Sequence, residues 1–229
     1  MKKRLLIIPA KGYSKRVKEK NIKKFHGKPI ISYTLSTAKK SKLFKKIHVS
    51  TESKKIKKIV ENLGYKIDFL RPKNLSKNNT PTIDVLKFVF NRFSDLKYDF
   101  DEIWTISCCA PLLNKNDLIK AAKKTQKDKV LLSITKFNAP IEWAFTIKKK
   151  KNLMPVCKEN LFKNSQNFSE KYHDAGAFAV FPISFLKKNN INLENNFTGF
   201  TLPRERAIDI DNTDDWNLAE ILYKANLKR

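Results

Sequence analysis

Basic and hydroxyl side chains gather in one short loop near the N-terminus, directly after a continuous apolar run over residues 5–8. The loop contains Gly12, Ser14, Lys15, Arg16, Lys18 and Lys20. A continuous apolar run is typical of a central strand, and open α/β sheets bind ligands where such strands end. Gly12 permits a turn that a Cβ would obstruct, and backbone N–H groups with lysine and arginine suit a triphosphate. Alternatively, the loop is basic only because the whole chain is rich in lysine.

A pair of carboxylates lies near the other end of the chain, in Asp209-Ile210-Asp211. On a strand, residues two apart project to the same face, so the two carboxylates would repel each other unless a cation lay between them. Mg²⁺ prefers one or two carboxylates together with phosphate oxygens, so the pair is a candidate metal site opposite the basic loop. The alternative is that Asp211 and its polar neighbours only begin a helix.

Tyr172, His173 and Asp174 form a third candidate, immediately before Ala175-Gly176. In a loop these side chains could converge on a polar ligand, whereas on a strand adjacent residues face opposite sides. A lone histidine is also compatible with a structural hydrogen bond. The adjacent Cys108 and Cys109 have no activating base in the pattern, so we interpret them as buried thiols.

The elements that must position these groups alternate between strand and helix. Strands are expected at 5–8, 46–50, 65–70, 102–107, 130–135, 177–181, 199–202 and 207–210. Helices are expected from Pro29, over 52–63 with Gly64 as the stop, over 80–93 and 117–124, and after a Thr213 cap. This order predicts right-handed crossovers and a mainly parallel α/β sheet. Residues 137–176 lose the pattern and are expected to be an insertion outside the main sheet.

Composition favours a single soluble globular domain over residues 1–229, with no apolar run long enough to span a bilayer. The net charge of +26 raises the alternative of nucleic-acid binding, but the lysines are dispersed along the chain rather than clustered. Three cysteines give neither a disulfide framework nor metal-ligand spacing, which favours a reducing, cytoplasmic location. In so lysine-rich a chain the arginines are notable, because their planar fork matches phosphates. They include Arg16, Arg71, Arg204 and Arg206.

Several of these motifs resemble one known family. The run from Ile8 to Lys15, closed by Lys20-Asn21, is similar to the Ile-Pro-Ala-Arg-Gly-Gly-Ser-Lys…Lys-Asn signature of the CMP-sugar synthetases, the cytidylyltransferases that activate sialic acids. Asp209-Ile-Asp resembles their metal motif, and the segments at 71–72, 75–76 and 80–82 resemble their nucleotide loop. Ala139-Pro140-Ile141, Ser165-Gln166 and Tyr172–Gly176 resemble the pseudaminic acid branch most.

The resemblance implies a three-layer α/β/α, Rossmann-like fold of the nucleotide-diphospho-sugar transferase type, with two copies forming a homodimer through the insertion. It implies that CTP is bound by Ala10, Lys11, Gly12, Ser14, Lys20, Asn21, Arg71, Ser76 and Thr80. It implies that an acidic nine-carbon sugar is bound by Ser107, Gln166, Tyr172, His173 and Asp174. Asp209 and Asp211 would hold Mg²⁺, and Lys11, Lys20 and Asp211 would be catalytic.

The sequence departs from the family pattern at several of these positions. Lys11 stands where the family has arginine, and Tyr13 replaces a glycine. Around the sugar motifs, Asn164 and Asn167 replace an arginine and an aspartate, and Glu142-Trp143 replaces a Gln-Arg pair. Pseudaminic acid is therefore the first expectation, with N-acetylneuraminic, legionaminic and 3-deoxy-octulosonic acids as alternatives. A catalytically impaired nucleotide-binding protein and a basic nucleic-acid-binding protein are the alternatives of another class.

Overall fold

A computed structural model describes residues 2–148, 152–187 and 196–227. Its strands are β1 (Arg4–Pro9), β2 (Lys24–Phe25), β3 (Lys28–Pro29), β4 (Lys46–Ser50), β5 (Glu102–Ile106), β6 (Val130–Lys136), β7 (Phe145–Ile147), β8 (Leu153–Pro155), β9 (Tyr172–Pro182) and β10 (Phe197–Thr201). Its α-helices are α1 (Ile31–Ser41), α2 (Lys54–Asn62), α3 (Thr82–Asp95), α4 (Lys115–Ala122), α5 (Ile183–Lys187) and α6 (Thr213–Leu227). None of the helices in the described ranges is long and apolar enough to cross a membrane.

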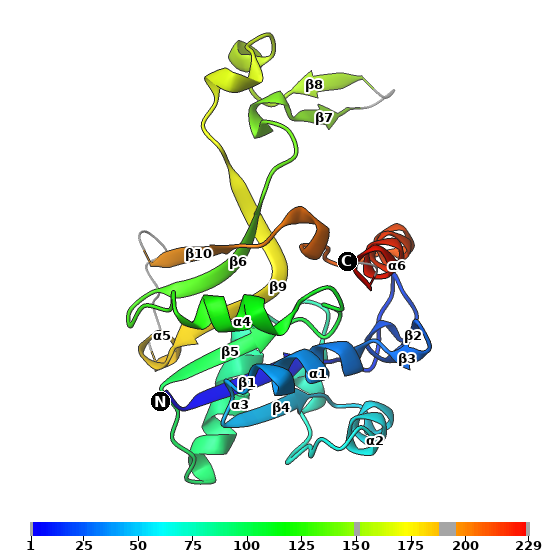
Figure 1. The fold of residues 1–229 in the computed structure, drawn as a ribbon, viewed down its shortest axis with the longest axis vertical. Helices are drawn as coiled ribbons and strands as arrows, with labels where there is room; N and C mark the ends of the chain where they lie inside the picture. Colours follow the sequence, from blue (N-terminus) through cyan, green and yellow to red (C-terminus); the bar gives the residue numbers. More distant parts are fainter. Residues whose placement is uncertain (1, 149–151, 188–195, 228–229) are drawn as a thin grey trace.

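The main sheet has the strand order β10-β6-β9-β5-β1-β4, which places β1 between β5 and β4. Strand β9 is antiparallel to both of its neighbours, whereas the remaining pairs are parallel, so the predicted mainly parallel α/β sheet is confirmed. Figure 1 shows helices on both sides of this sheet.

Strand β1 is buried on both faces because successive side chains enter two different cores. Leu6 and Ile8 belong to the larger core, with residues of α1, α2, α4 and α6. Leu5 and Ile7 pack with α3 and α5 in the smaller one. The continuous apolar run therefore marks a central strand, as expected, and the loop after Pro9 leaves the middle of the sheet.

Two expected strands are absent. Residues 65–70 form no backbone ladder, because side chains hold them instead: Asp68 pairs with Lys46 of β4 at 2.8 Å, and Ile67 is buried. Residues 207–210 are likewise outside any strand. The chain there passes from a short 3-10 turn, whose Arg206 makes two hydrogen bonds to Asp117, directly toward α6.

Two expected helix starts are also corrected. Pro29 lies in the short strand β3, and α1 begins only at Ile31. At α6 the cap is Asn212, whose Oδ1 accepts the Asp215 N–H at 3.0 Å, and not Thr213. The expected helix stop at Gly64 is confirmed, since Gly64 has a φ of +82° after the end of α2.

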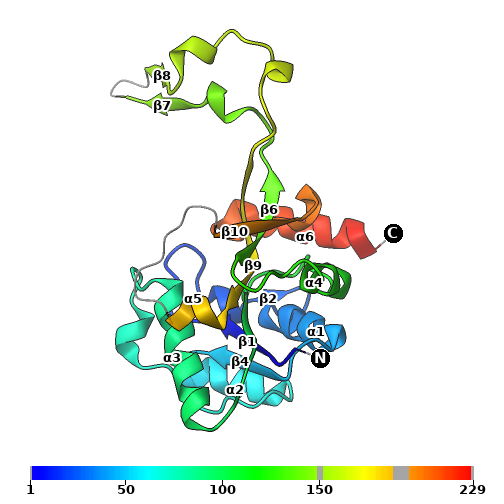
Figure 2. The ribbon, with the colours of Figure 1, turned by 90° about the vertical axis from the view of Figure 1, so that its left-hand side faces the viewer.

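The insertion is shorter than the sequence indicated. Tyr172, His173 and Asp174 already belong to β9, paired with Lys136, Thr135 and Ile134 of β6. The described residues between β6 and β9, 137–148 and 152–171, form a separate projection with the β7–β8 hairpin, which we call the arm. Figures 1 and 2 show the arm standing away from the sheet and its helices.

Candidate active site

A cavity of about 890 Å³ opens where β1 and β5 end, beside the middle of β9. Of the residues proposed from the sequence, the cavity is lined by Lys11, Ser14, Lys20, Asn21, Arg71, Ser76, Thr80, Ser107, Asp174 and Asp211. Ala10, Gly12 and Asp209 do not line it, nor do Gln166, Tyr172 and His173. The nucleotide residues named from the sequence therefore share one cavity for the most part, whereas most of the sugar residues lie elsewhere.

A Cβ at position 12 would be obstructed, as expected, and the obstruction comes from the neighbouring helix α2. A Cβ there would lie 2.8 Å from the Cβ of Ser53, which caps α2. Gly12 is absent from the positive-φ residues, so close approach between the loop and α2, rather than a special backbone conformation, demands the glycine. Its N–H donates to Glu52 Oε1 at 2.7 Å.

Asn21 fixes the same loop from within the protein. Its Nδ2 donates to the Lys11 carbonyl at 2.8 Å, and its Oδ1 faces Cys109 Sγ at 3.5 Å. Cys108 Sγ lies 3.6 Å from the Asn21 carbonyl oxygen, and burial raises the pKa of this thiol well above its usual value. The two thiols are thus buried packing groups around Asn21, in line with the sequence interpretation.

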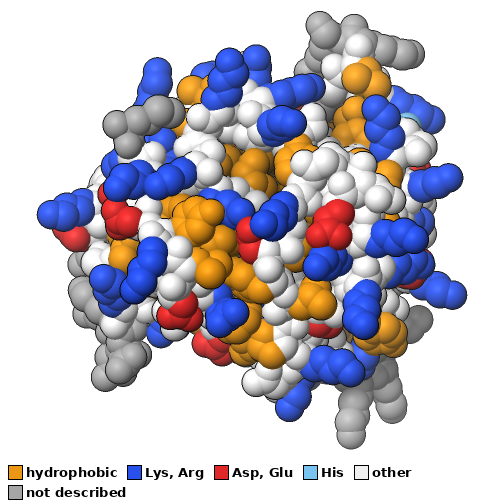
Figure 3. Space-filling view, turned by 90° about the horizontal axis from the view of Figure 1, so that it is seen from below, with side chains coloured by type: hydrophobic (Ala, Val, Ile, Leu, Met, Phe, Trp, Pro, Cys, Tyr) orange, Lys and Arg blue, Asp and Glu red, His pale blue; other side chains and the backbone are white. Residues whose placement is uncertain are grey.

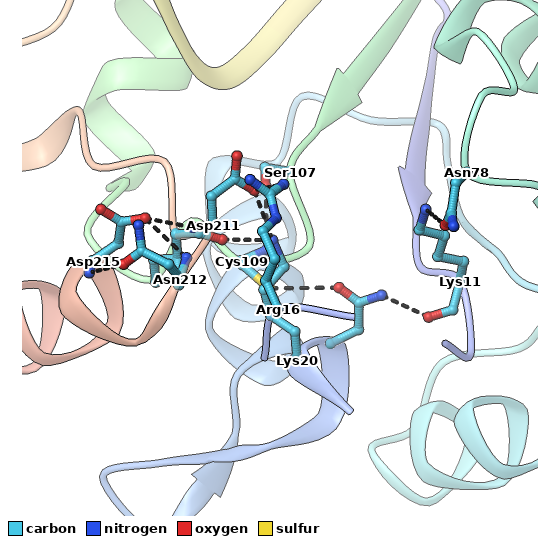
Figure 4. A network of polar contacts seen from close by, with 11 residues as sticks. Lys11, Arg16, Lys20, Asn78, Ser107, Cys109, Asp211, Asn212 and Asp215 are labelled. Atoms are coloured by element: carbon cyan, nitrogen blue, oxygen red, sulfur yellow. Dashed lines mark hydrogen bonds and ion pairs between the residues drawn. The ribbon is translucent and has the colours of Figure 1, made fainter. Parts of the chain in front are cut away.

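Lys20 connects the basic loop to the distant aspartates. Its Nζ donates to the Ile210 carbonyl at 2.5 Å and lies 3.3 Å from Asp211 Oδ1. Arg16 Nη2 approaches the same Asp211 oxygen at 2.9 Å, and Figure 4 shows both cations converging on it. The glycine loop and the Asp209-Ile210-Asp211 segment are therefore within ion-pair distance, although about 190 residues separate them.

The side chain of Asp211 does not cap the start of helix α6, which was the alternative interpretation of this residue. Helix α6 is begun by Asn212 and by Asp215, whose Oδ2 accepts the N–H groups of Asp211 and Asn212 at 2.8 and 3.0 Å. Figure 4 shows this separate set of contacts beside Asp211. The carboxylate of Asp211 is consequently directed toward the cavity and its cations.

Asp209 lies behind Asp211 in a cluster of like charges. Desolvation raises the pKa of Asp209, and the charges of Asp211, Asp215 and Asp174 raise it further, while Lys20 opposes them. A Cβ on Gly176 would lie 2.9 Å from Asp209 Oδ2, so the bare glycine leaves room for this carboxylate. Sequence reasoning assigned Asp174 to the sugar and missed its place beside the two aspartates.

The donors in this cluster fit a hard divalent cation, because all of them are carboxylate oxygens. Within the described ranges, no three histidine, cysteine, aspartate or glutamate side chains are arranged to hold a metal ion by themselves. A cation here would complete its shell with water and substrate oxygens, which is the usual situation for Mg²⁺ at a nucleotide site.

The far wall of the cavity comes from residues 71–80. Arg71 is almost fully buried, and its Nη2 and Nε lie 3.0 Å from Glu52 Oε2 and Ser76 Oγ, respectively. Lys11 Nζ reaches this wall by donating to Asn78 Oδ1 at 3.1 Å (Figure 4). Glu52 was not identified from the sequence, where its Ser-Thr-Glu-Ser surroundings resemble an ordinary helix start.

The cavity is strongly cationic. Its basic residues are Lys11, Lys15, Arg16, Lys20, Arg71 and Lys77, against Asp174 and Asp211. Elsewhere the charges are mixed: on the face in Figure 3, lysine and arginine side chains are distributed with acidic and hydrophobic ones between them. Such a cavity attracts a polyanion, because low-dielectric walls strengthen the field of the charges that line it.

Three of the proposed sugar residues lie on or beside the arm. Gln166 is exposed in a 3-10 turn of the arm, Ser165–Asn167. Tyr172 Oη donates to Glu170 Oε2 at 2.9 Å, and the ring of His173 lies 4.8 Å from that of Phe137. Of the two alternatives for Tyr172, His173 and Asp174, a loop or a strand, the structure shows the strand β9, from which only Asp174 lines the cavity.

Comparison with known proteins places these observations in a context. A family model described as cytidylyltransferase matches residues 5–211. Pseudaminic acid cytidylyltransferase of Campylobacter jejuni is 33% identical over 226 residues, covering 98% of this chain and 97% of that protein. CMP-N,N'-diacetyllegionaminic acid synthase of Legionella pneumophila is 26% identical over 228 residues, with 97% of each chain covered.

Solved structures agree on the fold. CMP:2-keto-3-deoxy-manno-octonic acid synthetase, complexed with CTP, has a TM-score of 0.71 at 14% identity, and the match covers 98% of this chain and 99% of the other. At that identity the likeness concerns the fold alone. It confirms the three-layer, Rossmann-like architecture expected from the sequence.

Proposed function

The chain belongs to the cytidylyltransferase family, and from that premise we propose that it transfers CMP from CTP to an acidic nine-carbon sugar, pseudaminic acid, with release of pyrophosphate. The observation that carries the proposal is the meeting of the basic loop and the aspartate segment at one cavity, with Lys20 Nζ 3.3 Å from Asp211 Oδ1. Cations for a triphosphate and a carboxylate for a divalent ion then line the same cavity.

In this proposal the anomeric hydroxyl of the sugar attacks the α-phosphorus of CTP, and the bond to the β-phosphate oxygen breaks. Lys11, Ser14 and Lys20 neutralise the pyrophosphate as negative charge develops on it. The Gly12 amide is already bound to Glu52, so these side chains, rather than that amide, carry the stabilisation. Lys20 is held in place by the Ile210 carbonyl, which limits the reorganisation it needs during the reaction.

Asp209 and Asp211 would hold Mg²⁺, together with phosphate oxygens and water. A bound magnesium ion would neutralise phosphate charge and lower the pKa of the attacking hydroxyl. The raised pKa of Asp209 supports this role, because a second positive charge is what would favour its ionised form. In the protein alone, Arg16 and Lys20 neutralise Asp211.

The sugar half of the site is proposed to be shared between two copies of the chain. Ser107 and Asp174 line the cavity, whereas Gln166, Tyr172 and His173 lie on or beside the arm. The arm also exposes large apolar side chains that a monomer would leave in water. They are Phe145, Ile147, Leu153, Val156 and Phe162. A homodimer in which the arm reaches the partner's cavity would cover them and complete the site.

We place this activity in the cytoplasm, where CTP is made and thiols stay reduced. The described structure contains free Cys108, Cys109 and Cys157, as expected from their spacing. The same chemistry on another nonulosonic acid is the alternative, since residues near Gln166 depart from the pseudaminic pattern.

A pyrophosphate-release assay with CTP and Mg²⁺ tests the proposal across pseudaminic, legionaminic, N-acetylneuraminic and 3-deoxy-octulosonic acids. The expected result is turnover that is fastest with pseudaminic acid. CTP-dependent thermal stabilisation without turnover on any sugar would instead identify a nucleotide-binding protein that has lost catalysis. Steeply salt-dependent binding to single or double strands, in competition with CTP, would favour the nucleic-acid alternative.

A further inference from the structure

Glu52 occupies the short connection between β4 and α2, directly before the Ser53 cap. Its side chain is only 18% exposed, and it does not line the cavity. Each of its two carboxylate oxygens nevertheless contacts a different segment of the cavity wall. Glu52 therefore lies outside the cavity lining, but it can decide where the groups of that lining are held.

Oxygen Oε1 accepts the Gly12 N–H at 2.7 Å, which holds the basic loop between Lys11 and Ser14. Oxygen Oε2 accepts the Ser76 hydroxyl at 2.9 Å and Arg71 Nη2 at 3.0 Å. In the proposed function, the first segment meets the phosphates of CTP, so we take the second segment to lie by its nucleoside. One buried carboxylate thus joins the two ends of the nucleotide site.

A second bridge between these segments exists, but it is made by a group that the reaction needs. Lys11 Nζ donates to Asn78 Oδ1 at 3.1 Å across the cavity mouth, and this pair is exposed. When Lys11 turns to a phosphate, that bridge opens. The contacts of Glu52 do not use any side chain of the basic loop, because the donor is the Gly12 backbone, so they persist in the loaded protein.

The lowered pKa of Glu52 agrees with a carboxylate that stays ionised while it joins the two segments. Burial alone would raise the pKa of Glu52, but hydrogen bonds from the Gly12 amide, its own amide, Arg71 and Ser76 together lower it below the usual value. Arg71 is 4% exposed in its side chain, and Glu52 is the carboxylate that pairs with it in the described structure. Removing that charge leaves a buried guanidinium without its counterion.

We propose that Glu52 is a positioning residue that couples the phosphate end of the nucleotide site to its nucleoside end, one end on each carboxylate oxygen. The inference rests on the proposed function, since it takes the nucleotide to lie across both segments. It predicts that the two ends can be released separately, because the two oxygens have different partners.

The variants Glu52→Gln and Glu52→Ala distinguish the two ends, because the first disturbs one end and the second disturbs both. In Glu52→Gln the amide oxygen can still accept the Gly12 N–H, but the amide nitrogen then faces the Arg71 guanidinium, and two donors cannot pair. In Glu52→Ala both ends are released. Ser76→Ala removes a partner at the nucleoside end only.

The experiment measures calorimetric dissociation constants for CMP alone and for inorganic pyrophosphate alone, with kcat and KM for CTP. For Glu52→Gln we expect the CMP constant to rise about tenfold, while that for pyrophosphate stays within about twofold of the wild type. For Glu52→Ala we expect both constants to rise about tenfold, and KM for CTP to change more than kcat.

Glu102→Ala is the matched control, because Glu102 is similarly buried and pairs with Arg4 at the opposite end of β1. It should lower the thermal midpoint but leave both dissociation constants unchanged. The proposal is overturned if Glu52→Ala weakens only one ligand, or if Glu52→Gln weakens both equally. Failure of the wild type to bind either CMP or pyrophosphate would contradict the proposed function itself, whatever the variants do.

Discussion

The cavity and the arm differ in how complete each is within one chain. Around the cavity, groups from distant parts of the sequence already contact one another: Lys20 binds the Ile210 carbonyl, and Gly12 binds Glu52. On the arm, Gln166 is exposed and does not line the cavity. The arm as a whole stands away from the sheet (Figures 1 and 2). The groups proposed for the nucleotide are therefore brought together by the fold of one chain, whereas most of those proposed for the sugar are not, which is why we propose that a second copy completes the site.

This difference has a physical origin. The cavity lies where the parallel strands of a buried sheet end, so the same packing that stabilises the fold also brings its loops together. In its described residues the arm has two short strands, β7 and β8, and several of its large apolar side chains are exposed. A segment with so little core of its own gains stability by covering its apolar surface with a partner.

The largest expected effect comes from the centre of the cavity. Asp211→Ala should reduce turnover about 100-fold or more, because it removes a proposed magnesium ligand and the partner of Lys20. Pyrophosphate release at saturating CTP, with Mn²⁺ binding followed separately by electron paramagnetic resonance, checks both roles. Normal turnover in this variant would show that Asp211 is not a magnesium ligand that the reaction needs. Reduced turnover with unchanged Mn²⁺ binding would show that Asp211 acts only as the partner of Lys20.

A smaller effect is expected where the basic loop meets α2. Gly12→Ala would place a methyl group 2.8 Å from Ser53 Cβ, and the loop must shift to relieve it. We expect the dissociation constant for CTP to rise about tenfold and the free energy of unfolding to fall by about 1–3 kcal/mol. The constant for the sugar in the presence of CTP should change much less, which would sharpen the distinction between the two halves.

The control for that variant is Gly64→Ala, because a Cβ at Gly64 meets nothing within 4 Å. The positive φ of +82° makes alanine strained, so stability should fall by about 1–2 kcal/mol. CTP binding should not change. If both alanine variants weaken CTP equally, the loop position at residue 12 has no special role.

The smallest effect on activity is expected from a buried histidine far from the catalytic groups. Burial lowers the pKa of His48 from 6.5 to about 4, with Asp68 opposing the shift. The unfolded chain therefore binds this proton below pH 6.5, whereas the folded chain does so only near pH 4. The free energy of unfolding should fall over this interval as the pH is lowered, by about 3 kcal/mol at most.

Urea unfolding between pH 7 and pH 4 measures this dependence, and His48→Gln should flatten the curve over the same interval. Nucleotide affinity at pH 7 should be the same in both proteins. An unchanged slope in the variant would show that His48 is not the source of the loss of stability in acid.

Much of the cavity was predictable from the sequence because its key groups lie in short, recognisable motifs. The apolar run before the basic loop predicted a central strand, and the two aspartates suggested a cation site opposite Lys20. The strand expected at 207–210 was wrong, yet Asp211 still faces the cavity, because Asn212 and Asp215 supply the helix start.

What the sequence did not predict depends on contacts between segments. Glu52 has no distinctive local pattern, and its importance appears only once Gly12, Arg71 and Ser76 surround it. For His173 and Asp174 the sequence left a loop and a strand open, and only the pairing of β9 with β6 decides for the strand, on which their side chains have different surroundings. Long-range strand pairing of this kind is not encoded in any single motif.

The division of the site between a cavity and an arm from another copy is the central claim, and isolated heterodimers test it directly. One subunit carries Asp211→Ala, the other carries Gln166→Ala with Tyr172→Ala, and two different affinity tags select the mixed species. If the arm completes the partner's cavity, each homodimer is inactive and the heterodimer regains about half of the wild-type pyrophosphate release, from its one intact site of two. A heterodimer that stays as inactive as its parents, or a wild-type chain that is active as a monomer, would contradict the account.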